Sequence, residues 1–568
     1  MTSSSEYPLG YGQRLVPHII DDRARENPSQ LFATFPKSSR IEDGFHEVTY
    51  GQFANAINAS YIGPSELRYA ILTVGAIKTG HKAFFPSPRN SIEAHLSLLE
   101  SACCDVLLTA KKCHPVVEEI VYRRSMRRIV VPELEEWISA PLALSYPFET
   151  TFAKARYEPF VALHTSGSTG LPKLVVIPHG TLASIDAWQL LPSEGASPTI
   201  IQSFQGIRLF MPFPPFHAAG LYIMLPLAVF CNITIVLPPA EPLTAELADS
   251  IHVHGNVEGT ILPTSVLSDI VKDTELYNNL QNLKFVAFGG APLSKEVGDA
   301  VKAKSWPVNW LGATELCFTA LEKMHADDWE YMKFHDCMGI DFRYHGEDLY
   351  EMFIIRDDAL NLYQGIFCTF PHLREYSMKD LYSKHATKEG LWRYRGRSDD
   401  VIVFSNGEKM NPLTIEARIS SHEMVSSALV LGNDRFQSAV LVELAKPTYD
   451  QEYQRQLLDS IWTTVEQANE TTEAHGRISK SLIMFTSPDK PMLRAGKGTV
   501  QRKLTLDAYG KEIEALYIAS NVDATPLADQ HTLDTENIDS LSSSLTTLIF
   551  RSTGILLDPE DEIFEKRH

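Results

Sequence analysis

The sequence predicts an α/β protein built from several structural units, and three observations indicate this class. The chain has 568 residues, which at about 150 residues per domain corresponds to three or four units. Short apolar runs alternate with amphipathic stretches, a pattern typical of largely parallel sheets covered by helices. The pattern changes near Glu347 and again after residues 396–400, so further units begin at these points.

Strands are expected wherever a short apolar run is bounded by turn residues. In the N-terminal half, six such runs are predicted to be buried strands: Val106 to Thr109, Arg128 to Val131, Val161 to His164, Ile233 to Leu237, Gly259 to Leu262 and Phe285 to Phe288. From about Glu347 the runs Leu349 to Ile355 and Gly365 to Phe370 predict a smaller β-rich unit that closes the large domain.

A compact C-terminal α/β domain is expected after the motif G-R-S-D-D at residues 396–400. Its predicted elements are a strand at Val401 to Phe404, a helix at Asn411 to His422, strands near Ala428 to Leu431 and Ala439 to Leu444, and a helix from Asp450 to Asn469. Asn521 to Thr532, with Pro, Ala, Asp, Gln and Thr, is predicted to be a linker.

The composition describes an ordinary globular protein with a small-molecule ligand. Hydrophobic residues make up 44% and charged residues 21% of the chain. The net charge of −20 argues against a nucleic-acid partner, which requires clustered Lys and Arg. Seven cysteines without a C-x-x-C pair give neither a disulfide framework nor a zinc site, so a reducing, cytoplasmic location is expected.

Neither a signal peptide nor a membrane span is predicted. Residues 1–10 are polar and lack an apolar segment. The longest apolar run, Leu221 to Pro239, approaches membrane-spanning length, but Pro226 and Asn232 divide it into a helix-like and a strand-like part. We therefore expect no membrane partner.

The segment T-S-G-S-T-G-L-P-K, Thr165 to Lys173, suits a polyphosphate. Glycines let the backbone approach phosphate oxygens, hydroxyl groups add donors, and a lysine adds a point charge. These residues are Thr165, Ser166, Gly167, Ser168, Thr169, Gly170 and Lys173. The segment is not a Walker A loop, because Pro172 precedes the lysine and Leu174 follows it. A solvated Ser/Thr/Gly linker is the alternative interpretation.

Five further segments have both a structural and a chemical interpretation. The histidine of F-P-P-F-H-A-A-G (213–220) is either a packed or capping residue or a ligand group. The structural interpretation is a tight turn for F-G-G-A-P (288–292), a solvated acid for M-K-D-L-Y (378–382) and a basic turn for R-A-G-K-G-T-V-Q-R-K (494–503). The remaining segment is W-L-G-A-T-E (310–315).

Together these segments resemble the adenylate-forming (ANL) superfamily, which contains acyl-CoA synthetases, luciferases and the adenylation domains of nonribosomal peptide synthetases (NRPS). The resemblance covers most of the chain. It implies a large N-terminal domain of two α/β subdomains plus a small β-barrel-like unit, hinged to a small C-terminal α/β domain. The implied domains are an N-terminal adenylation core (1–397), a C-terminal mobile subdomain (398–520), a linker (521–533) and a partial carrier (thiolation) domain (534–568).

The resemblance also implies roles for individual residues. The Thr165 loop would bind the ATP phosphates, and the backbone of Gly290, Ala291 and Pro292 would pack against adenine. Thr314 would donate to the α-phosphate, and Glu315 would hold Mg²⁺. Asp380 would accept from the ribose hydroxyls, Arg397 would contact ribose and phosphate, and Asp399 would be the hinge. The sequence departs from the usual motifs in having Leu311 where Tyr is usual and Lys379 where Gly is common.

Lys497 is implied as the catalytic lysine between the substrate carboxylate and the α-phosphate. Arg502 follows it by five residues rather than the commoner three, so Lys503 remains an alternative. His217 is implied to gate the acyl pocket. Amino-acid-selecting members carry Asp at this position to bind an α-ammonium, so the expected substrate is a small carboxylic acid without a free α-amino group.

Three segments resemble fungal NRPS-like carboxylic acid reductases: G-Y-G-Q-R-L-V-P-H (10–18), F-F-P-S-P-R-N-S (84–91) and the carrier-like end. The D-S-L at 539–541 is less favoured as a phosphopantetheine site than as the start of a carrier helix, Ser540 to Ser552, with the attachment serine beyond His568. The implied reaction forms an acyl adenylate and pyrophosphate, transfers the acyl group to a phosphopantetheine thiol, and leaves NADPH-dependent reduction to a reductase domain outside this chain.

Alternatives remain open. The chain could be a stand-alone acyl- or aryl-CoA ligase, or an inactive nucleotide-binding module. The acid could be aromatic, aliphatic, α-keto or a betaine whose cation is held by Phe216, Tyr222 or Trp310. Between the helix-like segment Phe53 to Ala59 and the next block at Tyr61 there is no room for the helix and strand that members of the superfamily have, so an irregular edge of the first sheet, or impaired folding, is expected.

Overall fold

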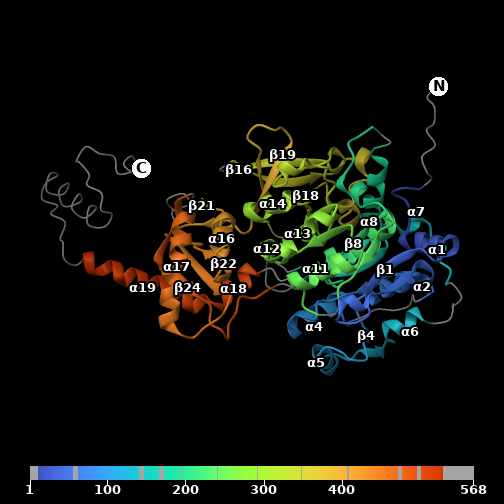
Figure 1. The fold of residues 1–568 in the computed structure, drawn as a ribbon, viewed down its shortest axis with the longest axis horizontal. Coiled ribbons are helices and arrows are strands. Elements are labelled where there is room, and N and C mark those ends of the chain that lie inside the picture. The colour runs from blue at the N-terminus through green and yellow to red at the C-terminus, as the bar shows by residue number, and fades with distance from the viewer. Residues whose placement is uncertain are drawn as a thin grey trace.

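The computed structural model describes residues 10–55, 62–139, 146–165, 172–192, 195–239, 241–290, 292–346, 348–405, 408–470, 472, 476–494 and 500–528. Figure 1 shows a large N-terminal core and a smaller C-terminal unit, coloured orange to red, placed at one end of it.

A seven-stranded sheet forms the centre of the core, in the order β12-β11-β10-β8-β9-β1-β2. Its strands are β1 (Leu31–Pro36), β2 (Phe45–Thr49), β8 (Arg208–Phe210), β9 (Thr234–Val236), β10 (Gly259–Leu262), β11 (Phe285–Phe288) and β12 (Trp306–Asn309). All neighbours are parallel except β1 and β2. Parallel neighbours need crossover connections, and helices supply them: α11 (Ala245–His254), α12 (Thr264–Lys272), α13 (Thr274–Asn279) and α14 (Lys295–Lys302).

A second group of strands carries the expected phosphate loop. β3 (Ala83–Phe84), β6 (Pro159–Thr165) and β7 (Lys173–Pro178) form a three-stranded sheet, and β6 and β7 are an antiparallel pair. β4 (Val106–Thr109) and β5 (Arg127–Val130) form a separate parallel pair. The helices in this part of the sequence are α1 (Val16–Glu26), α2 (Tyr50–Asn55), α3 (Arg68–Lys78), α4 (Ile92–Ser101), α5 (Val116–Arg123), α6 (Leu134–Ile138), α7 (Phe152–Ala155) and α8 (His179–Ala187).

The edge of this second group is irregular, as the short spacing after Phe53 predicts. Ile62 makes only an isolated parallel bridge with Thr109, beside the detached β4–β5 pair. Residues 56–61 lie outside the described part of the chain. The bridge marks the position where a neighbouring strand would continue the sheet.

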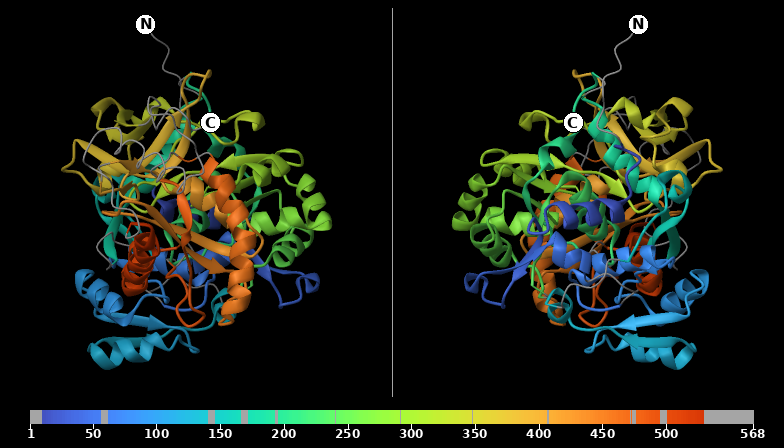
Figure 2. Two further views of the ribbon diagram at one scale, coloured as in Figure 1. Left: turned by 90° about the vertical axis from the view of Figure 1, so that its left-hand side faces the viewer. Right: turned by 90° about the vertical axis from the view of Figure 1, so that its right-hand side faces the viewer.

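A five-stranded antiparallel sheet closes the core, in the order β15-β19-β18-β17-β16. Its strands are β15 (Met332–Lys333), β16 (Ile340–Gly346), β17 (Leu349–Ile355), β18 (Glu375–Lys384) and β19 (Leu391–Arg397). The views of Figure 2 place it at the opposite end of the core from the β4–β5 pair. The predicted strand Gly365 to Phe370 is wrong: Ile366–Thr369 is the short helix α15, and a short buried apolar run does not distinguish the two structures.

The C-terminal unit is a three-stranded sheet with helices on both faces. Its strands are β22 (Val425–Leu431), β23 (Ser438–Leu444) and β24 (Ile478–Phe485), preceded by the pair β20 (Ile402–Val403) and β21 (Lys409–Met410). Helices α16 (Leu413–Ser420) and α17 (Gln451–Glu470) share one hydrophobic cluster with alternate sheet residues such as Val430 and Val440. The other face, with Leu429 and Leu441, packs against Tyr509 and Tyr517 from the segment of α18 (Arg502–Ala508) and α19 (Gly510–Ala528).

Two segment predictions can be compared with these elements. α19 continues to Ala528, so residues 521–528, expected as the first part of the linker, are helical. The apolar run 221–239 divides as predicted: a helical part, α9 (Ala218–Tyr222), a π-helical turn (Ile223–Leu227) and α10 (Ala228–Cys231), precedes strand β9. Among the described helices, none combines the length and the hydropathy that a bilayer span requires.

Candidate active site

A cleft of about 1230 Å³ lies between the core and the C-terminal unit. The core contributes the turn after β11, the segment after β12, and strands β18 and β19, while α16 and the end of α17 face it from the other side. Five of the sequence-predicted site residues line it: Gly290, Pro292, Glu315, Asp380 and Arg397. The cleft therefore gathers the residues expected around adenine, ribose and Mg²⁺.

The other predicted residues have different positions. Five described residues do not line the cleft: Thr165, Lys173, His217, Thr314 and Asp399. Thr314 is the neighbour of Glu315, and Asp399 lies two residues after Arg397. Thr165 belongs to β6, Lys173 to β7, and His217 precedes α9. Ser166, Gly167, Ser168, Thr169, Gly170, Ala291, Lys497 and Ser540 lie outside the described residues.

Glu315 lies in a tight hairpin between β13 (Gly312–Ala313) and β14 (Cys317–Phe318). A Cβ on Gly312 would lie 2.5 Å from the Cys317 carbonyl oxygen, so this position requires glycine. Burial raises the pKa of the Glu315 carboxyl, and the charge of Arg397 opposes this shift. Among the described residues Glu315 has no ion-pair partner, and a half-buried carboxylate without one suits a hard cation such as Mg²⁺.

Asp380 and Arg397 are cross-strand partners on β18 and β19. Their charged atoms are 3.5 Å apart, and the Asp380 side chain is only 9% exposed. Arg397 also donates from Nε to Asp399 Oδ1 at 2.9 Å and from Nη2 to Asp399 Oδ2 at 3.2 Å. The guanidinium therefore joins the residue expected at ribose to the residue expected at the hinge.

Asp380 belongs to strand β18, and its low exposure excludes the alternative interpretation as a solvated acid. Lys379, directly before it, has a φ of +62°, a left-handed conformation that glycine adopts without steric cost. This geometry explains in physical terms why Gly is common at this place in the superfamily. The lysine retains the geometry, so the departure in sequence does not displace Asp380 from the cleft.

The Gly289–Gly290 turn forms the wall where adenine is expected. Gly290 has a φ of +80°, and a Cβ on Gly289 would lie 2.5 Å from the Trp310 carbonyl oxygen. Phe288, the last residue of β11, packs edge-on against Trp329 at a centroid distance of 6.0 Å. The small residue at position 289 lets the turn lie close to the segment that follows β12.

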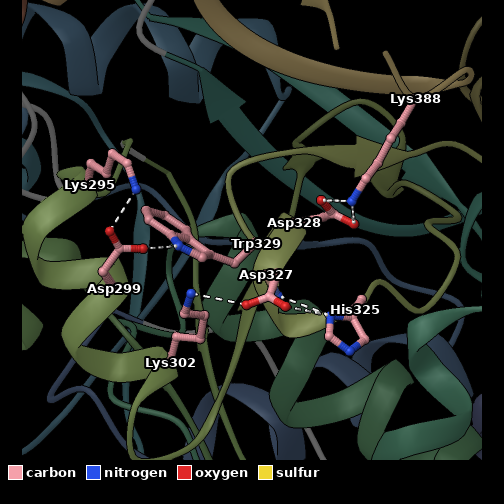
Figure 3. Close-up of polar contacts among 8 residues, drawn as sticks. All are labelled: Lys295, Asp299, Lys302, His325, Asp327, Asp328, Trp329 and Lys388. Atoms are coloured by element: carbon pink, nitrogen blue, oxygen red, sulfur yellow. Dashed lines mark hydrogen bonds and ion pairs between the residues drawn. The ribbon is translucent and has the colours of Figure 1, made fainter. Parts of the chain in front are cut away.

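Trp329 is a buried wall residue that no sequence motif indicates. Figure 3 shows its indole donating to Asp299, which also accepts from Lys295. The Nε1 to Oδ1 distance is 3.1 Å. A Cβ on Gly298 would lie 2.1 Å from the indole, so the ring lies directly on α14. Tyr376 is a second cleft residue that no motif indicates. Burial raises the pKa of its hydroxyl, the charges of Glu315 and Asp380 raise it further, and the charge of Arg397 lowers it.

His217 is the N-cap of α9, and its Nδ1 accepts from the Ala219 amide at 3.3 Å. A Cβ on Gly220 would lie 2.2 Å from the Pro214 carbonyl oxygen, so the F-P-P-F-H-A-A-G segment folds tightly back on the helix. The capping interpretation describes this contact, and the gate stays a prediction.

Trp310 does not suit a betaine cation. The ring is 5% exposed and stacks on both Phe204 and Phe318, at centroid distances of 4.9 and 4.4 Å. These neighbours cover the ring, so the expectation that Trp310 offers a face to a cation is not supported by its packing.

Thr165 and Lys173, the two ends of the expected phosphate loop, are cross-strand partners. His164, one residue earlier, accepts at Nε2 from the Ser87 amide at 3.0 Å, and Asn90 Nδ2 lies 3.2 Å away. The F-F-P-S-P-R-N-S segment therefore lies beside the C-terminal end of β6. Burial lowers the pKa of His164 to about 4.

The flanks of the expected lysine loop lie away from the cleft. Arg494 pairs with Glu443 and donates to Ser427 Oγ at 3.0 Å. Met492 and Val500 belong to the hydrophobic cluster on the face of the C-terminal sheet opposite α16 and α17. Since α16 and α17 line the cleft, the sheet face that Met492 and Val500 cover is turned away from it.

Arg502 has a structural role. It donates to the Val430 carbonyl and to Glu416 Oε1, both at 2.6 Å, and lies 3.5 Å from Asp400. These contacts fix the start of α18, and the neighbouring Lys503 is exposed.

Comparison with known proteins places these observations in a family context. Residues 60–337 match the AMP-binding enzyme family, and residues 399–521 match the AMP-binding enzyme C-terminal domain. A carboxylic acid reductase of Neurospora crassa is 39% identical over 535 residues, covering 89% of this chain and 51% of that protein. The adenylate-forming reductase Nps11 of Serpula lacrymans is 28% identical, covering 99% of this chain and 54% of that protein.

Solved structures agree with the fold. The anthranilate CoA ligase AuaEII in complex with anthranoyl-AMP superposes with a TM-score of 0.64 at 16% identity, covering 89% of this chain and 99% of that one. The expected fold class is thereby confirmed. The chain spans about half the length of these curated reductases.

Proposed function

Because the chain belongs to the ANL superfamily of AMP-binding, adenylate-forming enzymes, we propose that its cleft condenses a carboxylic acid with ATP. The carboxylate oxygen attacks the α-phosphorus, the α–β anhydride bond breaks, and pyrophosphate leaves with that bond's electron pair. The products are an acyl adenylate and pyrophosphate.

One observation carries this proposal: Glu315, Asp380, Arg397 and the Gly290 turn line the same cleft, although they come from four separate segments. A half-buried carboxylate without an ion-pair partner among the described residues, an acceptor for ribose hydroxyls, a planar cation and a glycine backbone are the groups that a magnesium nucleotide requires. Their common location supports a single nucleotide site.

The residues present fit Mg²⁺ and ATP. Glu315 would hold the ion, which when bound would neutralise phosphate charge. Asp380 would orient the ribose, Arg397 would contact ribose and phosphate, and Thr314 would donate to the α-phosphate. The backbone of Gly290, Ala291 and Pro292 would receive adenine, and residues Thr165 to Lys173 would bind the outer phosphates.

Lys497 would supply the ammonium that stabilises charge between the carboxylate and the α-phosphate. In the present arrangement α16 and α17 face the cleft and the flanks of the lysine loop do not. We therefore assign Asp399 as the pivot of a rotation that brings the lysine loop in for the first half-reaction. Lys503 remains the alternative lysine.

The substrate would be a carboxylic acid without an α-ammonium. His217 stands where an acidic residue would bind that group, so a free α-amino acid is disfavoured. Aromatic, aliphatic and α-keto acids and a betaine are the candidates; of the three rings expected to hold a betaine cation, that of Trp310 is covered by Phe204 and Phe318.

In the second step the thiolate of a phosphopantetheine arm would attack the acyl carbonyl, and AMP would leave. The curated relatives are named as reductases, so carrier and reductase domains of a longer protein are the proposed partners, with NADPH serving the reductase. A stand-alone CoA ligase is the second candidate, favoured by the structural match to AuaEII. Residues 534–568, the proposed partial carrier, lie outside the described chain.

The test is carboxylate-dependent exchange of labelled pyrophosphate into ATP over a panel of aromatic, aliphatic and α-keto acids and a betaine. We expect exchange with at least one acid and its loss in Glu315→Gln and Lys497→Ala. Acyl-CoA formation with free coenzyme A would identify the ligase instead. Absence of exchange over the whole panel would leave the inactive nucleotide-binding module.

A further inference from the structure

The turn that carries Thr314 and Glu315 is held from outside by two side-chain hydroxyls. The Tyr222 hydroxyl donates to the Thr314 carbonyl oxygen at 2.7 Å. Thr369 Oγ1 donates to the Glu315 carbonyl oxygen, also at 2.7 Å. Consecutive carbonyls of one turn are thus bound by residues from two different elements, α9 and α15.

Tyr222 connects this turn to the helix that begins at His217. Its side chain is buried, with 1% of the residue exposed, and its ring packs edge-on against Phe318 at 6.3 Å. A hydroxyl in a dry environment costs free energy unless it is hydrogen-bonded, so the contact with Thr314 is held firmly. Helix α9, which follows the residue proposed to gate the acyl pocket, is thus linked to Thr314, the residue proposed to bind the α-phosphate.

Thr369 connects the turn to α8, the helix that follows β7. Its Oγ1 lies 2.8 Å from that of Thr181, so the Thr181 hydroxyl can donate to Thr369 while Thr369 donates to Glu315; Thr181 Oγ1 also lies 2.9 Å from the Gly365 carbonyl oxygen. The helices meet closely: a Cβ on Gly180 would lie 2.7 Å from Cys368 Sγ, and one on Gly365 would lie 2.5 Å from Ser184 Oγ. Glu315 is therefore fixed to the same rigid pair of helices that supports the β6–β7 hairpin.

The hydroxyls constrain a turn that its own hydrogen bonds hold weakly. The Leu316 amide donates to the Ala313 carbonyl at 3.3 Å, and Cys317 has a left-handed φ of +73°. Binding the carbonyls of residues 314 and 315 fixes the peptide planes on both sides of the Glu315 Cα, and this sets the direction of the carboxylate.

We propose that Tyr222 and Thr369 are positioning residues that hold Thr314 and Glu315 in the geometry needed for the α-phosphate and the metal ion. The assignment of those two ligands rests on the proposed function, whereas the clamp itself is a property of the fold. The two parts can therefore be tested separately.

The chain offers matched controls. Thr319, at the base of the same hairpin, and Tyr382, in the five-stranded sheet, are both fully buried, and neither hydroxyl has a hydrogen-bond partner among the described residues. Thr369→Val and Tyr222→Phe remove the two hydroxyls that bind the turn. Thr319→Val and Tyr382→Phe are the controls, because they remove buried hydroxyls without a hydrogen-bond partner among the described residues. Thr369→Ser keeps the hydroxyl at position 369.

The first measurement is amide hydrogen–deuterium exchange of peptides covering residues 311–319, which requires no activity. Thr369→Val and Tyr222→Phe should speed exchange in the hairpin by about two- to tenfold, as expected for one lost hydrogen bond, while the controls and Thr369→Ser match the parent protein. Equal hairpin exchange in the clamp and control variants would overturn the proposal.

The second measurement is the Mg²⁺ concentration that gives half-maximal pyrophosphate exchange. Thr369→Val should raise it by about two- to tenfold with the KM for the acid unchanged, and Thr369→Ser should restore it. A raised acid KM with unchanged Mg²⁺ dependence contradicts the metal-positioning role. If the parent protein shows no pyrophosphate exchange but the hairpin loosens as expected, the clamp stands and the proposed function fails.

Discussion

Arg397 lies between two carboxylates and divides its hydrogen-bond donors unequally between them. It binds Asp399 through two donors, at 2.9 and 3.2 Å, and stays 3.5 Å from Asp380. The Asp380 carboxylate lines the cleft, where a ribose diol would reach it. We therefore expect this carboxylate to contribute to nucleotide binding.

We expect Asp380→Asn to raise the KM for ATP by about 10- to 100-fold, because a hydrogen bond to a charged acceptor is stronger than one to a neutral group. The acid KM should change little. Steady-state pyrophosphate exchange measures both. Asp341→Asn, in an exposed pair with Arg343 on β16, is the control; a similar ATP KM in the two variants would contradict the ribose assignment.

At the scale of elements, helices α8 and α14 are each held in place by the contacts of one residue, Asp186 on α8 and Trp329 against α14. Asp186 of α8 is fully buried and accepts from the Gly12 amide at 2.8 Å, from Arg14 and from Gln189. The motif G-Y-G-Q-R therefore acts as a clasp on the helix after the phosphate hairpin. α14 is fixed by Trp329 in a comparable way.

Replacing Arg14 with Met should reduce the free energy of unfolding by about 3–5 kcal/mol, because it leaves Asp186 as a buried charge without its cation. Urea denaturation measures the change. Arg25→Met, which breaks the exposed pair with Asp22, should cost less than about 1 kcal/mol. Comparable losses in both variants would show that the clasp is not a buried ion pair in solution.

Gly298→Ala should destabilise the core by about 1–3 kcal/mol, because the new methyl group collides with the Trp329 indole. The displaced indole lines the cleft, so the KM for ATP should rise as well. Thermal unfolding and pyrophosphate exchange report the two effects. Gly510→Ala, where a Cβ meets no atom within 4 Å, is the control; an unchanged ATP KM in Gly298→Ala would remove Trp329 from the nucleotide wall.

Elements differ in how far the sequence determines them. β10, β11 and β17 have the predicted bounds, since turn residues delimit their apolar runs. The sequence predicts a strand at Gly365 to Phe370, where the structure has α15, because a short apolar run has no periodicity that distinguishes a buried helix from a buried strand; residues 366–368 are all buried. Asp380 and Glu315 were predicted from motifs, but Trp329 and Tyr376 reach the cleft only through the folding of distant segments, which no local pattern encodes.

Buried histidines make the stability of the whole molecule depend on pH. Burial lowers the pKa of His252 to about 3 and those of His95, His164 and His179 to about 4, against an ordinary value of 6.5. At pH values between about 4 and 6.5, these histidines are protonated in the unfolded chain but neutral in the native state. Stability is therefore fully present above about pH 6.5 and is lost as the pH falls towards 4.

The urea midpoint should accordingly fall steadily from pH 7 to pH 4. In His252→Leu the dependence should become shallower by about one proton, because that site no longer takes up a proton on unfolding. Urea titrations at pH 7, 6, 5 and 4 determine the slopes. An unchanged slope in His252→Leu would show that His252 is not held neutral in the native state.

The arrangement of the two units is the other property of the whole molecule. The cleft is closed by α16 and α17, while the segments flanking residues 495–499 pack on the opposite face of the C-terminal sheet. Adenylation as proposed requires the second face at the nucleotide, so the account depends on one chain presenting two faces in turn to one site.

A crystal structure with a non-hydrolysable acyl-adenylate analogue and Mg²⁺ tests this account most directly. We predict adenine against Gly290, ribose hydroxyls on Asp380, the metal ion on Glu315, and Lys497 turned inward beside the α-phosphate. An analogue bound elsewhere, or bound in this cleft with Glu315 and Lys497 lining separate crevices, would contradict it.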